Sequence, residues 1–291
     1  MRSKLLFRIF KLLLAVGAVI GIERFCHKQT RGFSLPNIYS DSIEYAASSS
    51  DEREIAPLLS QPFTFLDSGL ECYAFLSEDR KLVLKLFKHQ HIRQADLIAK
   101  LIPLPYFIKL TQMKQERLLS TFSSCKLAYE EMREETGLLF LHLNRTEGSL
   151  PVVTLIDKLG IRHEVALNEV HFILQKKADL LIPALSNDLK KEGSSSAKRR
   201  IAALFELIRV RCQKGIADRD PTLCKNYGFL DDRAIVIDVG SFSKNAFLQN
   251  PQIYKRELFY ETLPLRCLLS REFPELLPYF NEEFEKAISG F

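Results

Sequence analysis

The sequence lacks the local patterns that mark zinc sites, disulfide frameworks and serine hydrolases. Its six cysteines form no C-x-x-C pair and its six histidines form no pair at ligand spacing, so neither zinc ligation nor a disulfide framework is indicated. No G-x-S-x-G motif and no internal repeat occur. Lys and Arg total 41 against 36 Asp and Glu, and the resulting charge of +5 is dispersed, so no specific nucleic-acid binding is expected.

The chain is long and apolar enough to fold without such supports. Its 291 residues, 46% of them hydrophobic, suffice for a two-lobed core that needs no disulfides. Indications of function therefore come from the spacing of polar residues between apolar runs.

The most informative stretch is residues 215–240, where a polar loop is followed by two apolar runs. These runs, Tyr227–Leu230 and Ala234–Val239, flank the turn-prone pair Asp231 and Asp232. Bulky apolar runs on either side of two such acids predict a β-hairpin.

Three polar side chains are expected to meet at the edge of this hairpin. Asp238 lies at the end of the second arm, where a carboxylate is costly unless a cation, usually a metal ion, meets it. Asp220 and Asn226 come just before the first arm, so the fold would bring all three together. This arrangement predicts a site for Mg²⁺ and a phosphorylated nucleotide.

These residues resemble the motifs of the protein-kinase-like superfamily, including its small bacterial and antibiotic-phosphotransferase branches. Asp218-Arg219-Asp220 resembles the His-Arg-Asp triplet with its first position changed, and Asp238-Val239-Gly240 resembles the Asp-Phe-Gly triplet. Asn226 is similar to the metal-binding Asn, one residue further along than in the family pattern. The resemblance implies ATP and Mg²⁺ as cofactors, with Asn226 and Asp238 binding the metal and Asp220 orienting or deprotonating the acceptor hydroxyl.

A lysine upstream adds to this resemblance. Residues 63–88 predict three short strands, and in the third Lys85 shares one face with Val83 and Phe87. One reading of Lys85 is an edge-strand lysine that discourages aggregation. The resemblance makes it the strand-three lysine that aligns the inner phosphates and pairs with a helix glutamate.

The turn between the first two of these strands resembles the phosphate-covering loop in part. The family pattern is G-x-G-x-x-G, whereas the equivalent positions here are Asp67, Gly69 and Cys72, so Gly69 is the one glycine that remains. Asp67 beside a phosphate would add repulsion unless a cation intervenes.

Residues 123–144 are rich in helix formers and begin with serines suited to capping, so they predict one long helix. Acids on its apolar stripe need a partner, and Lys85 is the expected one. Glu131 and Glu134 lie on that stripe, and the helix register does not separate them. The neighbouring acids that also remain candidates are Glu130 and Glu135.

Further segments complete an N-terminal lobe over residues 57–178. Strands at 151–156 and 165–174 would complete a five-strand sheet, and 175–181 would form the hinge beside the adenine ring. The basic segment 88–121 is longer than a compact family member needs and is a candidate for an inserted substrate or partner element.

A reduced helical C-terminal lobe is predicted over residues 179–291. A helix at 197–212 would deliver the loop that carries Asp220, and helices at 254–269 and 275–288 would close the chain. The expected fold is therefore α+β, a protein-kinase-like two-lobed fold with an N-terminal apolar segment.

That apolar segment, residues 1–22, is a separate matter. Four basic residues accompany an apolar run from Leu12 to Ile22, which is about half the length needed to span a bilayer. A signal-like or single-pass anchor, an amphipathic surface anchor and another type of secretion signal all fit. Residues 23–56 would be a tether. We expect association with a membrane through the N-terminus and a cytosolic kinase-like domain, with secretion into another cell left open.

These features together predict an ATP-dependent phosphotransferase whose acceptor, a protein, lipid or small molecule, is not specified. The leading alternative is a catalytically inactive pseudokinase acting as a membrane-associated binding or scaffold module. Its support is the glycine-poor loop, the missing histidine at Asp218 and the altered spacing to Asn226. A membrane-tethered adaptor without a nucleotide site is a third reading.

Overall fold

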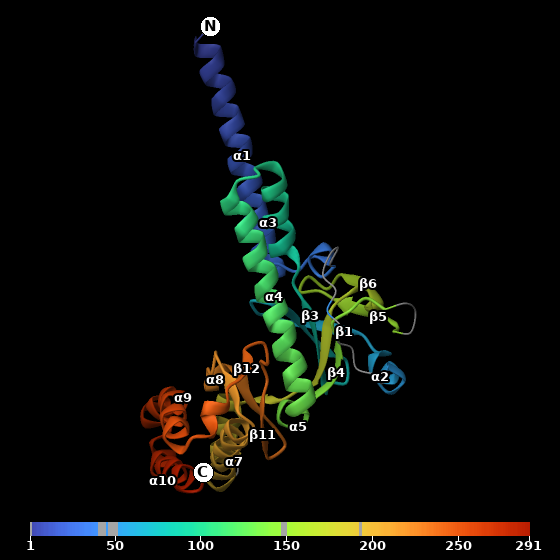
Figure 1. Cartoon of the computed structure of the whole chain (residues 1–291). Coiled ribbons are helices and arrows are strands. Elements are labelled where there is room, and N and C mark those ends of the chain that lie inside the picture. The colour runs from blue at the N-terminus through green and yellow to red at the C-terminus, as the bar shows by residue number, and fades with distance from the viewer. Residues whose placement is uncertain (1, 40–44, 46–51, 147–149, 192–193) are drawn as a thin grey trace.

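The structure is a mixed α+β arrangement with a large sheet on one side and a helical part on the other (Figure 1). It is a computed structural model that describes residues 2–39, 45, 52–146, 150–191 and 194–291. The α+β class predicted from the sequence is confirmed.

The large sheet has seven strands in the order β4-β7-β3-β2-β1-β5-β6. Neighbouring strands run antiparallel, apart from β1 and β5, which run parallel. The prediction of five strands was wrong because 165–174 divides between two strands and because β4 was taken for helix. The strands are β1 (Phe63–Ser68), β2 (Cys72–Ser77), β3 (Leu82–Phe87), β4 (Leu138–His142), β5 (Val152–Ile156), β6 (Arg162–Ala166) and β7 (Phe172–Lys176).

The alternating side chains of β2 and β3 separate the core from a cleft. Tyr73 and Phe75 of β2 and Leu84 and Leu86 of β3 are fully buried in the sheet's own core. Lys85 lies between the two leucines and points to the opposite face, as the period of two requires. The central position of β3, between β2 and β7, excludes the edge-strand reading of Lys85.

The long helix predicted at residues 123–144 is wrong in both bounds. Helix α4 (Pro105–Glu131) begins far earlier, with a proline at its first turn, where the missing N–H costs nothing. The short α5 (Arg133–Thr136) follows and ends at Gly137, whose φ of 65° is easily reached only without a side chain. The residues after Gly137 then enter the sheet as β4, which is buried on both sides and paired with β7.

The segment 88–121, expected as an inserted element, forms a helical hairpin. Helix α3 (Gln90–Leu101) packs against the N-terminal half of α4, and the hairpin projects from the sheet toward the side where the chain begins (Figure 1). The other half of α4 runs back along the sheet to the cleft, so one helix joins the projecting tip to the site.

The helical part confirms the helices predicted at 197–212, 254–269 and 275–288. Its core-facing stripe on α7 consists of Ile201, Leu204, Phe205, Ile208 and Cys212, all buried. Its elements are α6 (Leu181–Lys191), α7 (Ser194–Gln213), α8 (Leu223–Asn226), α9 (Pro251–Glu272) and α10 (Leu277–Ser289), with the short strands β8 (Asp179–Leu180), β9 (Ile216–Asp218) and β12 (Phe242–Lys244).

The predicted hairpin is confirmed, with a shorter second arm. β10 (Tyr227–Leu230) pairs antiparallel with β11 (Arg233–Val236), and Asp231 adopts a φ of 54° at the turn. The left-handed conformation suits a turn acid. β11 ends at Val236, so Asp238 lies in the loop beyond the strand rather than in it.

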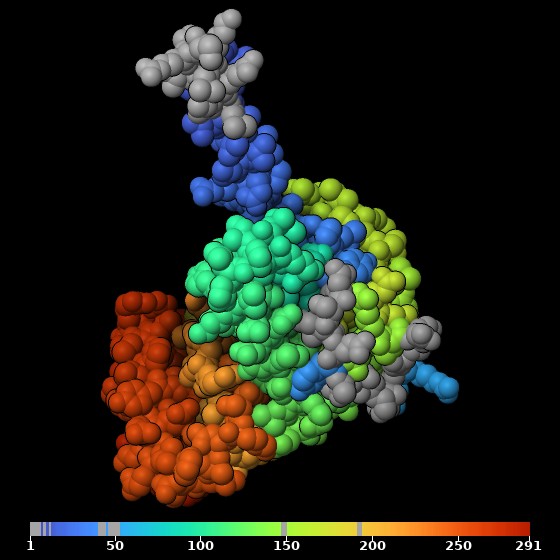
Figure 2. Space-filling view, turned by 45° about the horizontal axis from the view of Figure 1, so that its top comes forward, coloured from blue at the N-terminus to red at the C-terminus, as the bar shows by residue number. Residues whose placement is uncertain are grey.

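The N-terminal segment forms helix α1 (Arg2–Thr30), which stands clear of the body in both views (Figures 1 and 2). Within the described residues, no helix combines the length and apolar character that crossing a membrane requires. The expected tether, 23–56, contains packed residues: Phe33 and Ile38 are buried in the sheet's core, as are Ile55 and Leu59 of α2 (Glu52–Leu59). Residues 40–44 and 46–51 of that range lie outside the described residues.

Candidate functional site

A cleft of about 1340 Å³ opens between the large sheet and the helical part. Its lining includes the predicted residues Gly69, Lys85, Asp220, Asn226 and Asp238. They come from the β1–β2 turn, β3, the loop after β9, the end of α8 and the loop after β11. Segments more than 150 residues apart are thus brought to one cavity, which exceeds the usual size of a small-molecule site.

Lys85 reaches across the cleft from the sheet to the loop that carries Asp238. Its Nζ donates a hydrogen bond to the backbone carbonyl oxygen of Ile237 at 2.6 Å. Val83 and Phe87 line the same cavity, which confirms that they share a face with Lys85. The ammonium group therefore lies beside the segment of Asp238 with apolar side chains behind it.

The predicted ion pair between Lys85 and a helix glutamate is wrong. Glu131 pairs with Lys244 instead, and Glu135 pairs with Lys214 at 2.5 Å. Glu134 is exposed outside the cleft lining. No Asp or Glu of the described residues forms an ion pair with Lys85.

The physical reason is the register of α4. The cleft-facing residues of α4 lie roughly two to four turns before Glu131, where the helix ends, and Glu134 and Glu135 follow in α5. The residues that α4 presents to the cavity are Arg117, Ser120, Thr121 and Cys125.

The loop of Asp220 is held by local hydrogen bonds. The Thr222 hydroxyl donates to Asp220 Oδ1 at 2.8 Å, and Asn226 Nδ2 donates to the Asp220 carbonyl oxygen at 2.9 Å. Helix α8 occupies most of the interval between Asp220 and Asn226. The two predicted residues therefore remain adjacent despite the longer loop.

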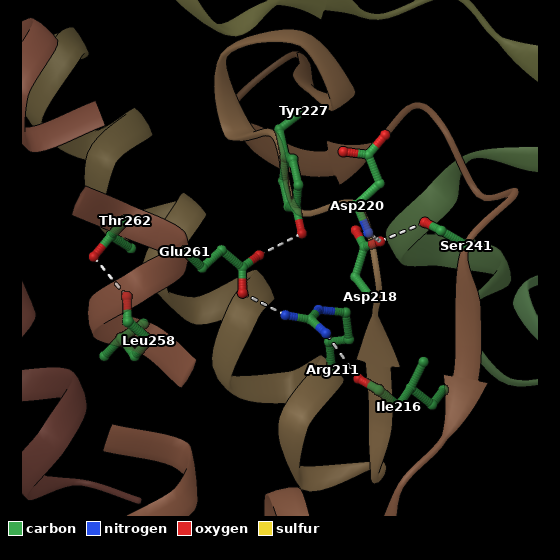
Figure 3. A network of polar contacts seen from close by, with 9 residues as sticks. All are labelled: Arg211, Ile216, Asp218, Asp220, Tyr227, Ser241, Leu258, Glu261 and Thr262. Carbon is green, nitrogen blue, oxygen red and sulfur yellow. Dashed lines mark hydrogen bonds and ion pairs between the residues drawn. The ribbon is translucent and has the colours of Figure 1, made fainter. Parts of the chain in front are cut away.

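Asp218 is a buried joint between this loop and the loop of Asp238 (Figure 3). Its Oδ1 accepts hydrogen bonds from the Asp220 backbone N–H at 3.0 Å and from the Ser241 hydroxyl at 2.5 Å. Its Oδ2 is buried without a hydrogen-bond partner in the described part of the chain. Burial raises the pKa of the Asp218 carboxyl, and the two hydrogen bonds oppose that rise. A buried carboxyl thus supports the backbone of Asp220.

A second set of buried polar residues, Arg211, Glu261 and Tyr227, lies near Asp218 inside the helical part (Figure 3). Arg211 donates to Glu261 Oε2 at 2.5 Å and to the Ile216 carbonyl oxygen at 2.8 Å. The Tyr227 hydroxyl donates to Glu261 Oε1 at 2.7 Å. Burial raises the pKa of Glu261, and the neighbouring guanidinium of Arg211 offsets part of that rise. These contacts join α7, α9, β9 and β10 beneath the loop of Asp220.

The loop of Asp238 is joined to α4 by Ser124, which no sequence motif singled out. The Ser124 hydroxyl donates to the Val239 carbonyl oxygen at 2.5 Å and accepts from the Phe242 backbone N–H at 2.5 Å. The contacts join residues more than 110 positions apart, so no local pattern points to them. Asp238 itself is exposed to the cleft, where its Oδ1 accepts from the Gly240 N–H at 3.2 Å.

Two cationic side chains, Lys88 and Arg31, contact the turn that carries Gly69. Lys88 Nζ donates to the Gly69 carbonyl oxygen at 2.5 Å and to the Ser68 hydroxyl at 2.8 Å. Arg31 forms an ion pair with Asp67 at 2.9 Å, with both side chains exposed. The arginine supplies the intervening cation that Asp67 would need beside a phosphate.

The donor set fits Mg²⁺ in a nucleotide complex and not as a site made by protein alone. Among the described residues, the carboxylate of Asp238 forms no ion pair. Asn226 donates a hydrogen bond through Nδ2, and its Oδ1 has no partner within the same residues. No cluster of three His, Cys, Asp or Glu suited to a metal occurs in that same part of the chain. Mg²⁺ usually takes one or two protein oxygens and completes its shell with phosphate and water.

Comparison with known proteins adds little to this geometry. No protein-family model and no curated protein matches the chain. Similar solved structures include the bifunctional kinase-methyltransferase WbdD, at 13% identity and a TM-score of 0.33 over 74% of this chain and 43% of that one. A complex of WbdD with the kinase inhibitor LY294002 has 13% identity and a TM-score of 0.35 over 76% and 45%. The chain spans less than half the length of these structures, and likeness at this level assigns no function.

Proposed function

We propose that the chain is an ATP-dependent phosphotransferase of kinase-like fold. The observation that carries the proposal is the convergence of Lys85, Asp220, Asn226 and Asp238 on one cleft. Each comes from the element that the kinase-like order requires. Lys85 lies in the third strand and Asp220 in the loop before the β10–β11 hairpin. Asn226 directly precedes that hairpin, and Asp238 lies in the loop that follows it.

Each residue has a distinct part in this proposal. Mg-ATP, when bound, supplies the phosphoryl group and neutralises charge on the phosphates. Lys85 donates hydrogen bonds to the inner phosphates after exchanging its contact with the Ile237 carbonyl oxygen. Asn226 and Asp238 provide metal-binding oxygens. Asp220, held by Thr222 and by the backbone contact to Asp218, orients the acceptor hydroxyl and accepts its proton.

A nucleotide-binding pseudokinase is the second candidate, and a specific observation favours it. Lys85 has no carboxylate partner within the described residues, and its Nζ is bonded to a backbone carbonyl oxygen. In active kinases a helix glutamate holds the corresponding lysine toward the phosphates. Without that acid, Lys85 is positioned by the loop of Asp238 alone.

Two substitutions separate the two candidates on the full-length chain. Asp238→Ala should abolish phosphoryl transfer and weaken Mg-ATP binding, because it removes a metal ligand. Asp220→Ala should leave binding intact and lower turnover by about 10²–10⁴-fold, because its role concerns the acceptor. Asp232→Ala, at the exposed hairpin turn, is the matched control and should change neither quantity.

The measurements are thermal shift with ATP in the presence of Mg²⁺ or EDTA, and transfer of labelled phosphate to the protein itself or to a lysate. Binding without transfer would replace the enzyme by the pseudokinase. Absence of any nucleotide binding would contradict both candidates.

A further inference from the structure

The tip of the α3–α4 hairpin exposes an unusual number of large apolar side chains. We define the hairpin tip as residues 97–114, which form the end of α3, the connecting turn and the start of α4. Leu101 is 72% exposed and Tyr106 is 70% exposed. The other apolar residues of the tip that stand in solvent are Leu97, Ile98, Ile102, Leu104, Ile108 and Met113. A soluble surface rarely gathers so many, and such patches mark interaction sites.

The charges of the hairpin tip are of one sign. Residues 97–114 contain Lys100, Lys109 and Lys114 and no acidic residue. Lys100 reaches back to Asp96, just before the tip, in a pair that is largely exposed. Apolar side chains flanked by lysines are the composition of a segment that enters the interface of an anionic bilayer, where lysine stems extend along the apolar region and their amines reach the headgroups.

Helix α1 has the same composition and leaves the body on the same side (Figures 1 and 2). Its exposed apolar residues include Phe10, Leu13, Val19 and Phe25, and its sequence holds six Lys or Arg against the single acid Glu23. Its apolar residues are spread around the circumference rather than gathered on one face. Exposed apolar side chains beside basic residues therefore give α1 the same composition as the hairpin tip.

The two elements are fixed relative to each other at their bases. The Tyr73 hydroxyl contacts both the Gly32 carbonyl oxygen, just after α1, and the side chain of Gln90, the first residue of α3. Asn37 Nδ2 donates to the same Gly32 carbonyl oxygen, and the Asn37 carbonyl oxygen accepts from the His89 N–H. These contacts join the bases of α1 and α3 through Tyr73 and Asn37.

We propose that the hairpin tip and α1 together form a single surface that inserts into the interface of an anionic lipid bilayer. The tip projects from the sheet (Figure 1), and its exposed apolar residues lie on both helices and on the turn between them. A deformable lipid interface can cover all of these faces at once, whereas a rigid partner would need a matching groove. Helix α4 continues from the tip to the cleft, and at 1.5 Å per residue Thr121 lies roughly 20 Å along the helix from Tyr106. Membrane contact would hold the cleft at a set height above the headgroups.

The absence of tryptophan makes a direct test possible. Tyr106→Trp places a single fluorescent reporter at the tip of the full-length chain. Phe247→Trp is the matched control, because Phe247 is also an aromatic residue, 74% exposed, and lies beside α9 in the helical part. Each variant is mixed with vesicles of pure phosphatidylcholine, or of phosphatidylcholine with 30% phosphatidylserine.

We expect a blue shift for tryptophan at 106 with the anionic vesicles, and no shift for tryptophan at 247. A protein in which Leu101, Leu104 and Tyr106 are all changed to Ser should bind those vesicles about tenfold less in sedimentation. Its circular dichroism and Tm should be unchanged, because all three side chains are exposed.

Three results would overturn the proposal. Binding to the vesicles without a shift at 106 would restrict membrane contact to α1. Equal binding to neutral vesicles would remove the role of the lysines. Self-association of the chain that the triple variant abolishes, with no vesicle binding, would make a second copy the occupant of the tip. These outcomes are independent of nucleotide binding, so they do not bear on the proposed phosphotransferase activity.

Discussion

Ser124 on α4 and Val239 beside Asp238 are joined by a hydrogen bond of 2.5 Å from the serine hydroxyl to the valine carbonyl oxygen. The same hydroxyl accepts from the Phe242 N–H, so one buried side chain satisfies two backbone groups of the loop. In protein kinases an ion pair between a strand lysine and a helix glutamate connects the helix to the nucleotide site. In the kinase-like interpretation of this chain, Ser124 makes the connection between α4 and the loop of Asp238.

We therefore predict that Ser124→Ala weakens Mg-ATP binding by altering the position of Asp238. The substitution leaves the Val239 carbonyl and the Phe242 N–H buried without a partner, which should cost about 1–3 kcal/mol of stability. The measurements are the unfolding free energy in urea and the Kd for Mg-ATP. Ser270→Ala, on an exposed face of α9, is the control and should affect neither. A loss of stability with an unchanged Kd would show that the bond does not position the metal-binding loop.

A second prediction concerns the buried pair of Arg211 and Glu261. Glu261→Gln should destabilise the protein by about 3–5 kcal/mol, because the guanidinium would stay buried without its counter-charge. Replacing both residues with apolar ones, Arg211→Met with Glu261→Leu, should recover part of that loss. Chemical denaturation of the three proteins measures this, with Glu285→Gln, at an exposed position of α10, as control. Equal stability of the single variant and the wild type would show that the pair contributes nothing net.

The sequence predicted residues whose roles depend on local pattern and missed those that depend on distant contacts. Asp220, Asn226 and Asp238 were selected because each lies at the boundary of a recognisable hairpin, and Lys85 because a cation interrupts an apolar strand; the structure places all four in the lining of one cleft. The expected partner of Lys85 was wrong because the acids at 131–135 lie at the end of α4 and in α5, beyond the part of α4 that faces the cleft. One continuous helix was predicted there, so the break after Glu131 and the entry into β4 were not expected.

The polar supports of the site were missed for a related reason. Ser124 and Ser241 are ordinary polar residues in the sequence, and their importance comes from contacts made after folding. Phe33 and Ile38 were assigned to a tether because polar residues surround them, although the sheet buries both. An isolated apolar residue in a polar segment carries no periodicity, and only the tertiary structure shows whether it is covered.

A third prediction follows from two buried histidines at the base of α3. His171 Nδ1 and His89 Nε2 lie 3.1 Å apart, so one donates to the other and both rings cannot be charged. Burial lowers the pKa of His89 to about 4 and that of His171 to about 3. Between about pH 6.5 and 4 these histidines are therefore protonated in the unfolded chain and neutral in the folded protein. Lowering the pH through this range favours the unfolded state. The stability from these groups is complete above pH 6.5 and falls as the pH drops toward 4.

Thermal unfolding between pH 7.5 and 4 tests this prediction. The Tm of the wild type should fall through that range, and His171→Phe should show a smaller fall because one buried titrating ring is removed. His27→Gln, which changes an exposed histidine of α1, should retain the wild-type slope. An identical slope for the His171 variant would show that other groups control the acid sensitivity.

The last prediction distinguishes α1 from the packed segment that follows it. Deleting residues 1–30 should leave a folded protein with unchanged Mg-ATP affinity, because the described side chains of α1 face solvent and the core begins at Phe33. Phe33→Ala in the full-length chain should instead cost about 3–5 kcal/mol, since its ring is buried against Tyr73 and Phe75. Circular dichroism melts and nucleotide titrations compare the two. If the deletion unfolds the protein, α1 belongs to the domain core, and the separation of a membrane-facing helix from the kinase-like body is wrong.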